Sequence, residues 1–137
     1  MRLSSLADYA VVIMSAAARH AGDARLSATL LAEETAIPLP TTQKLMGRLA
    51  AAGLFSSARG TGGGFVLARP AHAISLADII EAVEGPIALT ACVEEGKHDC
   101  ALEQGGCRMK PHWGAVNGAV RGALSGVTLE SLAGVAS

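Results

Sequence analysis

A glycine-rich run at residues 60–64 constrains the fold of this 137-residue chain more than any other feature. Two short, largely apolar stretches, 54–59 and 65–69, flank it, and Pro70 ends the second. Strand-like runs on either side of a glycine-rich turn predict a β-hairpin with the glycines at its tip. Because segments of helical periodicity surround this hairpin, we expect a mainly α-helical fold with one small β-hairpin.

Three helices are expected before the hairpin. Apolar residues recur at helical spacing over 3–17. Ser27 is the expected N-cap of a short second helix. The third helix is expected over 41–52, with Pro40 in its first turn, where the missing N–H costs nothing, and Gly53 as its stop.

Two helices are expected after the hairpin. One covers 76–84, with Ser75 as its N-cap, and the other follows Pro111 and runs through Leu124. The last helix carries glycines at 114, 118 and 122, and each lowers helix stability by about 1 kcal/mol relative to alanine. Their spacing of four favours close approach of a second helix.

Composition and charge exclude several classes of protein. Half of the residues are hydrophobic and the net charge is −1, which argues against a disordered chain. No apolar run approaches the roughly 18 residues of a membrane span, and Asp8 interrupts the stretch that a signal peptide needs, so we expect a cytoplasmic protein. Residues 1–70 carry seven basic and four acidic side chains (+3), whereas residues 71–137 carry four and eight (−4). This asymmetry mildly favours contact of the first half with a polyanion.

The order helix, short helix, turn, helix, hairpin is typical of a winged helix-turn-helix, in which the third helix enters the major groove. Polar donors cluster near the start of that helix, and an arginine stands beside the glycine-rich tip, where it can enter a minor groove. The bland alternative is that the polar residues only cap a helix and that the hairpin is merely structural. The candidate DNA-binding residues are Thr41, Thr42, Gln43, Lys44, Arg48, Arg59, Gly60, Gly62 and Gly63.

Three cysteines, Cys92, Cys100 and Cys107, have seven and six residues between them. This spacing matches neither the paired CxxC of zinc sites nor the tight run of bacterial ferredoxins. Thiolates gathered on a loop favour soft metals, so an iron–sulfur cluster, zinc and copper(I) all stay open. Cysteines acting only as small hydrophobes fit poorly with the polar segment 93–99.

A fourth ligand would complete such a site. His98 and His112 are near the cysteines in sequence. Asp8 is remote in sequence, but another element or another subunit could bring it close. Each has a plainer interpretation: an exposed loop residue for His98, a packed helix-start residue for His112, and a favourable charge in a first helical turn for Asp8.

Taken together, the hairpin RGTGGGF at 59–65, the helix segment ISLADII at 74–80 and the three cysteines resemble one family. This is the IscR-like family of dimeric winged-helix transcription regulators, which includes the nitric-oxide-sensing NsrR proteins. The resemblance covers nearly the whole chain, from Met1 through the helix of Trp113. The stretch EGPIALTAC at 84–92 is most similar to the proteobacterial subgroup that regulates the SUF iron–sulfur assembly operon.

The resemblance implies a homodimer that binds a double-stranded DNA operator. It also implies a [2Fe–2S] or [4Fe–4S] cluster on Cys92, Cys100 and Cys107. Some members add a histidine three residues after the last cysteine, a position that is Lys110 here and cannot ligate while protonated. Others add an acidic residue from the first helix of the partner subunit, and Asp8 occupies that position, with His112 as the next candidate.

Four regions follow from this resemblance. They are a winged helix-turn-helix DNA-binding region (1–70), a connecting helix (71–90), a cysteine loop that binds the cluster (91–110) and a dimerisation helix (111–130).

The expected function is a repressor that senses iron–sulfur, redox or nitric oxide status and controls iron–sulfur assembly genes. The chain has no P-loop and no nucleophile–base motif, and its glycine-rich segment precedes a strand instead of a helix, so we do not expect an enzyme. A zinc- or thiol-based redox regulator without a cluster is the main alternative. An iron–sulfur carrier protein is a further one.

Overall fold

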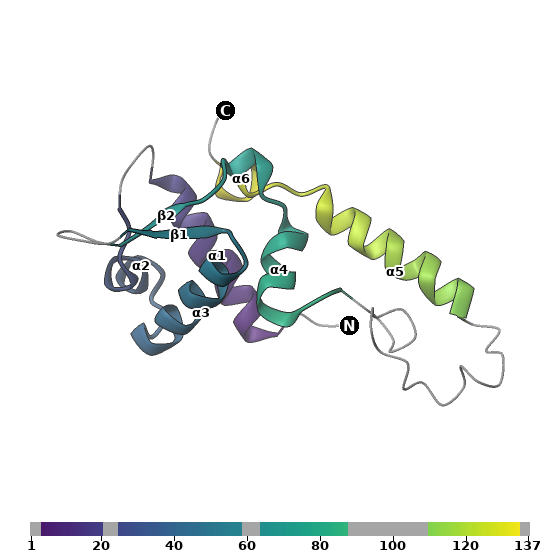
Figure 1. The fold of residues 1–137 in the computed structure, drawn as a ribbon, viewed down its shortest axis with the longest axis horizontal. Helices are drawn as coiled ribbons and strands as arrows, with labels where there is room; N and C mark the ends of the chain where they lie inside the picture. Colours follow the sequence, from purple (N-terminus) through teal and green to yellow (C-terminus); the bar gives the residue numbers. More distant parts are fainter. Residues whose placement is uncertain (1–3, 21–24, 59–63, 88–109, 135–137) are drawn as a thin grey trace.

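The computed structural model describes residues 4–20, 25–58, 64–87 and 110–134. Figure 1 shows the arrangement of the elements. In chain order they are α1 (Ser5–Arg19), α2 (Ala28–Thr35), α3 (Leu39–Ala51), β1 (Phe55–Ala58), β2 (Gly64–Leu67), the 3-10 turn η1 (Ala71–Ala73), α4 (Leu76–Glu84), α5 (Lys110–Ser125) and α6 (Leu129–Ala133).

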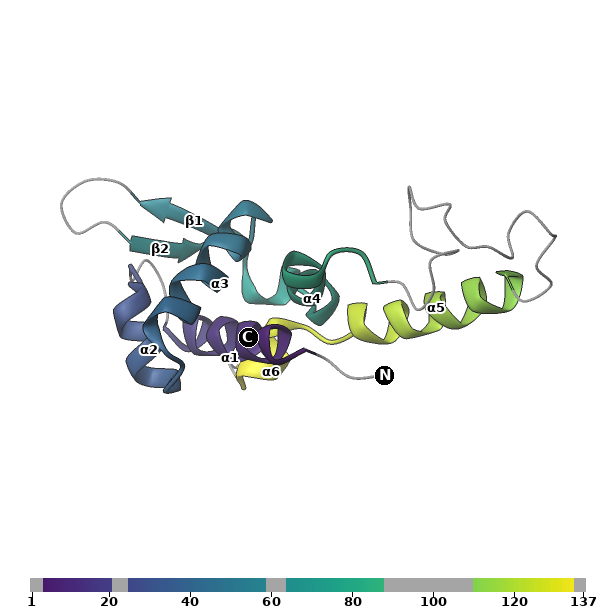
Figure 2. The same ribbon diagram turned by 90° about the horizontal axis from the view of Figure 1, so that it is seen from below.

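The molecule has two parts of unequal size. Helices α1–α4 and α6 pack with the hairpin into one unit, which we call the head, while α5 extends away from it in both Figure 1 and Figure 2. The hairpin lies at the end of the head opposite to α5. The mainly α-helical fold with one antiparallel β-hairpin is as expected from the sequence.

Serine side chains cap the starts of α1, α2 and α4. The hydroxyls of Ser4, Ser27 and Ser75 each accept a bond from the backbone N–H three residues on, at 3.0–3.1 Å. The predicted N-caps at Ser27 and Ser75 are therefore confirmed, and α4 has its predicted bounds. In α4 the cap is reciprocal, because the Asp78 carboxylate accepts from the Ser75 amide at 2.9 Å.

Helix α3 begins at Leu39, two residues before the predicted start, with Pro38 as its N-cap residue and Pro40 in its first turn. Proline fits these positions because the first-turn N–H groups have no intrahelical acceptor. The predicted stop is confirmed: Gly53 has φ +81° just after the helix.

The hairpin is tied to the head through Leu26. The residue pairs of its antiparallel ladder run from Phe55 with Leu67 to Ala58 with Gly64. Leu26 then exchanges both backbone hydrogen bonds with Phe65, at 2.7 and 2.8 Å. This bridge covers the outer edge of β2 and fixes the tip end of the ladder to the segment before α2.

The core of the head is built around α1, whose small residues allow close packing. Ala10, Ile13, Met14 and Ala17 are almost completely buried. Helices α2, α3, α4 and α6 all contact α1. The alanine-rich, aromatic-poor composition therefore serves helix-on-helix packing.

The C-terminal region differs from the single helix expected over 111–130. Helix α5 ends at Ser125, and a separate helix, α6, starts after Thr128, whose hydroxyl caps it. At the break, Thr128 forms a bridge with Ser75, and Leu129 next to it is fully buried in the head.

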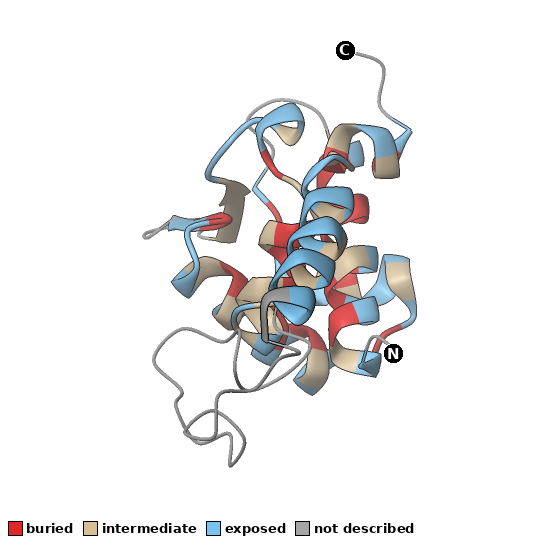
Figure 3. Ribbon diagram, turned by 90° about the vertical axis from the view of Figure 1, so that its right-hand side faces the viewer, coloured by how far each residue is buried: buried red, intermediate tan, exposed pale blue. Residues whose placement is uncertain are grey.

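Figure 3 looks along α5 and shows it exposed over most of its surface. Between His112 and Ser125 only Asn117, Val120 and Leu124 are partly buried, and their spacing places them on one helical face. Trp113 and Val116 remain 37% and 46% exposed. The described part of α5 therefore packs along one face only, against α4.

Candidate nucleic-acid interface and ligand residues

The first turns of α3 present polar side chains to solvent. Gln43 and Lys44 are exposed and Thr41 is partly buried. No acidic residue lies in the first turn of α3, so the positive end of the helix dipole is not neutralised there. The exposure of these side chains and the positive helix end suit phosphates and base edges, and contact of the three residues with DNA stays a prediction.

Thr42 does not belong to that surface, contrary to the expectation from the sequence. Its side chain is fully buried, and its hydroxyl donates towards the carbonyls of Pro38 at 3.1 Å and Ile37 at 3.4 Å. The hydroxyl thus stabilises the turn that leads into α3. A signal for this was available, because Thr42 precedes the buried Leu45 by three residues and so shares its face.

Arg48 lies in the last turn of α3, away from the exposed N-terminal turns. Its Nη1 donates to the carbonyl of Val83 in α4 at 3.2 Å. A guanidinium has five N–H donors, so this bond does not use up the side chain. The DNA contact at Arg48 stays a prediction, and the contact with α4 is one that sequence reasoning did not find.

The hairpin tip carries the other predicted DNA contacts. Arg59, Gly60, Gly62 and Gly63 lie outside the described residues. The structure places the two strands that lead to and from them, and Gly64 begins the second. A Cβ at Gly64 would lie 2.7 Å from the Leu26 carbonyl oxygen, so only glycine fits beneath this bridge.

The predicted cluster ligands are described in part. Cys92, Cys100, Cys107 and His98 lie outside the described residues. Within the described ranges, no group of three or more His, Cys, Asp or Glu side chains is arranged to hold a metal ion.

Asp8 is exposed in the first turn of α1, and its role as a cluster ligand stays a prediction. In the described part of the chain its carboxylate has no hydrogen-bond or ion-pair partner. It borders a hollow of about 170 Å³ between α1 and the α2–α3 turn, whose lining includes Tyr9, Val12 and Ile37. His112, the next candidate, is exposed near the start of α5.

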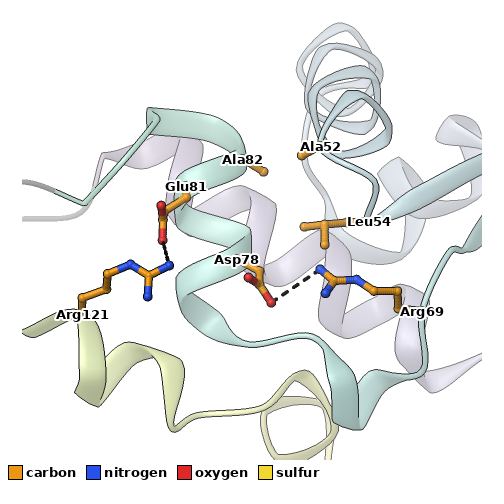
Figure 4. A pocket seen from close by; sticks show the side chains of 7 residues that line it. All are labelled: Ala52, Leu54, Arg69, Asp78, Glu81, Ala82 and Arg121. Atoms are coloured by element: carbon orange, nitrogen blue, oxygen red, sulfur yellow. Dashed lines mark ion pairs between the residues drawn. The ribbon is translucent and has the colours of Figure 1, made fainter. Parts of the chain in front are cut away.

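A second hollow, of about 250 Å³, lies beside α4 and is lined by two ion pairs (Figure 4). Arg69, just after β2, pairs with Asp78 at 3.5 Å, and Arg121 of α5 pairs with Glu81 at 2.8 Å. Helix α4 is thereby joined to the base of the hairpin on one side and to α5 on the other. Sequence reasoning did not single out these four residues, because pairs so far apart in the chain leave no local pattern.

Comparison with known proteins adds three findings. The family model Rrf2, described as an iron-dependent transcriptional regulator, matches residues 3–134. The chain is 37% identical over 134 residues to the HTH-type transcriptional regulator IscR of Photobacterium profundum, covering 96% of this chain and 75% of the relative. It is 36% identical to the IscR of Photorhabdus laumondii, with 96% and 79% covered.

Solved structures agree with this relationship. CymR, the global cysteine regulator of B. subtilis, matches with a TM-score of 0.74 and 29% identity, over 100% of this chain and 99% of that one. T. potens IscR matches with a TM-score of 0.69 and 27% identity, over 96% and 85%. In the described residues no helix is long and apolar enough to cross a membrane.

Proposed function

Because the chain belongs to the Rrf2 family of DNA-binding transcription regulators, which are not enzymes, we propose that it is a homodimer controlled by an iron–sulfur cluster. The proposed dimer acts in the cytoplasm and represses iron–sulfur assembly genes. The signal is iron–sulfur, redox or nitric oxide status. Cys92, Cys100 and Cys107 of one protomer and Asp8 of the other are the proposed ligands of a [2Fe–2S] or [4Fe–4S] cluster.

The observation that most supports a dimer is the uncovered surface of α5. Gly114, Gly118 and Gly122 repeat every four residues, and a Cβ added at any of them meets no atom within 4 Å. Trp113 and Val116 add exposed apolar surface on the same helix. A second helix packed on the glycine row could bring its backbone close to that of α5. Trp113 and Val116 lie on other sides of α5, because each residue turns the helix by about 100°, so a different part of a partner would have to cover them.

The chemistry of the proposed ligands fits a reactive cluster. Three thiolates suit the soft character of iron in such clusters, and a carboxylate is a harder and more exchangeable fourth ligand. Asp8 is exposed and unpaired within the described residues, so its carboxylate is available to another chain without breaking an internal contact. When bound, the cluster would supply reactivity towards oxygen or nitric oxide.

The remaining steps belong to the chain's own residues. Gln43 and Lys44 on α3 bind the DNA, and Arg59 at the hairpin tip enters an adjacent groove or binds a phosphate. Asp8 stands on α1, which packs directly against α3 and α4. A change in the binding partner of Asp8 therefore acts on α1, the helix against which α3 packs. A small change in the spacing of the two α3 helices of the dimer alters operator affinity.

The test is a mixed dimer purified without oxygen. One protomer carries Asp8→Ala and the other Cys100→Ala, with different affinity tags, so that only heterodimers are recovered. If Asp8 acts across the dimer, the heterodimer retains one complete ligand set. We expect native mass spectrometry to find one cluster per heterodimer and visible absorption near half that of the wild type.

The matched control replaces an exposed carboxylate on another helix, Glu33→Ala, and should keep the full cluster content. A heterodimer with no cluster, or Asp8→Ala homodimers with normal content, would exclude Asp8 as a ligand acting in trans. A colourless wild-type dimer that carries zinc, or that takes up no cluster on anaerobic reconstitution, would indicate the zinc- or thiol-based regulator instead.

A further inference from the structure

We propose that Arg48 is a positioning residue that fixes the recognition helix α3 to the C-terminal end of α4, and through α4 to α5. In the proposed dimer this chain of contacts sets the distance between the two α3 helices. The inference rests on the proposed function in one respect, that α5 forms the dimer. All of the contacts that carry it lie within the described residues.

The first joint connects α3 with α4. Val83 is the penultimate residue of α4, and carbonyls in a last turn lack intrahelical partners. Arg48 Nη1 donates to this carbonyl at 3.2 Å in a partly buried position. Helix α4 has no basic residue in its own last turn, so Arg48 supplies the positive charge that its C-terminal dipole favours.

The same end of α4 also holds the start of α1. The Ser4 amide donates to the Glu84 carboxylate at 3.2 Å. Arg48 and Ser4 thus meet adjacent residues of α4, Val83 and Glu84, from two different helices. The end of α4 is therefore where α3 and the N-terminus of α1, the helix of Asp8, are oriented relative to each other.

The second joint connects α4 with α5. Arg121 pairs with Glu81 at 2.8 Å, as Figure 4 shows, and Asn117 Nδ2 donates to the carbonyl of Ile87 at 2.9 Å. Asn117 and Arg121 are four residues apart and therefore lie on one face of α5. The Asn117 bond specifies a direction, whereas the Arg121–Glu81 pair is a charge contact in which Glu81 Oε1 accepts no hydrogen bond. The two contacts, one helical turn apart, favour one placement of α5 on α4.

The two joints link α3 to α5 through α4. Apolar packing between helices is non-directional, whereas the hydrogen bonds of Arg48 and Asn117 specify orientation. If α5 is held by a partner, the path α5–α4–α3 determines where each α3 lies. Loss of Arg48 should therefore reduce the difference in affinity between DNA duplexes of different half-site spacing. Loss of a DNA-contacting residue should instead weaken binding at every spacing by the same factor.

The experiment uses full-length dimer purified without oxygen and duplexes recovered with the wild-type protein from a random-sequence pool. From the best duplex, a series is made in which the half-site spacing is changed by one and two base pairs in each direction. The dissociation constant is measured on each for the wild type, Arg48→Met, Arg48→Lys and Lys44→Ala. Methionine retains much of the apolar stem of Arg48 and removes the donor, and lysine restores a donor.

We expect the wild type to prefer one spacing sharply. Arg48→Met should lose about tenfold of that discrimination, the effect of one charge-assisted hydrogen bond, and Arg48→Lys should recover part of it. Lys44→Ala should weaken binding to all duplexes while the preferred spacing stays the same. Circular dichroism checks that each variant is folded; if Arg48→Met is not, Arg121→Met breaks the second joint and decides by the same readout.

Two opposite results separate the inference from the proposed function. A wild type without any spacing preference would contradict two half-sites read by a dimer, and with it both proposals. A wild type with a sharp preference, and a folded Arg48→Met that keeps it or weakens binding uniformly, would overturn the positioning role alone. In that case Arg48 acts as an ordinary DNA contact or has no part in binding.

Discussion

The amide of Leu129 donates to the carbonyl of Ile74 at 2.8 Å, and both side chains are fully buried. A second bond runs in the opposite sense, from the Leu76 amide to the Val127 carbonyl at 2.8 Å. This pair of contacts joins α6 to the segment that caps α4. The chain thus leaves the head, forms α5 and returns to complete the core against α1.

Leu129→Ala tests how far the head depends on this return. Removing a fully buried leucine side chain costs transfer free energy and leaves a cavity, so we expect the free energy of unfolding to fall by about 2–5 kcal/mol. Urea denaturation followed by circular dichroism measures it. Ser131→Ala, an exposed position on the same helix, is the control and should change stability by less than about 0.5 kcal/mol. Equal small effects at both positions would mean that α6 is not part of the cooperative unit.

Local signals explain which parts of the fold could be predicted. Ser75, Asp78 and Gly85 fix both ends of α4 by capping chemistry within a few residues, and the structure reproduces those bounds. Helix α6 has five residues and depends on burial of Leu129 against elements distant in the chain. Its local signals, the Thr128 cap and Gly134 with φ +67°, bound only five residues, and so short a helix is stable only through that burial.

The candidate site divides in the same way. Polar residues at the start of α3 were predicted from helix position alone, and position alone could not separate the exposed Gln43 from the buried Thr42. The position of Thr42 three residues before the apolar Leu45 does separate them, because it places Thr42 on the buried face. The joints made by Arg48 and Arg121 required three-dimensional information, because each links residues on separate helices.

Gly64→Ala tests the bridge beneath the hairpin. A Cβ would lie 2.7 Å from the Leu26 carbonyl oxygen, a backbone atom that can move only if the bridge to Phe65 opens. We expect a loss of about 1–3 kcal/mol in stability and weaker DNA binding, because the strand that leads out of the hairpin tip shifts. Gly47→Ala is the matched control: nothing lies within 4 Å of its Cβ position, and alanine should stabilise α3 by up to about 1 kcal/mol. A Gly64→Ala protein as stable as the wild type would show that the bridge adjusts freely.

Thr42→Val and Lys44→Ala should separate stability from DNA binding on one helix. Valine keeps the shape of Thr42 but leaves the Pro38 carbonyl without its hydroxyl donor, so the free energy of unfolding should fall by about 1 kcal/mol. The folded Thr42→Val protein should bind DNA within a factor of about two of the wild type.

Lys44 is exposed, so Lys44→Ala should leave the unfolding curve unchanged and lower the salt dependence of DNA binding by about one unit of slope. Fluorescence anisotropy over a range of salt concentrations measures this. Reversed effects would place Thr42, and not Lys44, at the DNA.

Gly118→Leu tests the uncovered face of α5. In a single protomer the space around Gly118 is open, and leucine is a better helix former than glycine, so the protomer should fold at least as well as the wild type. If a second helix packs against the glycines, the leucine side chain keeps the two backbones apart, and sedimentation velocity should show monomers at concentrations where the wild type is dimeric.

The control is Ala119→Leu, about 100° around the same helix. It adds similar bulk away from the glycine row and should leave the dimer largely intact. Because both substitutions are hydrophobic, a loss of dimer at Gly118 but not at Ala119 would reflect the geometry of close approach, and a Gly118→Leu protein that remains dimeric would place the interface on another face of the molecule.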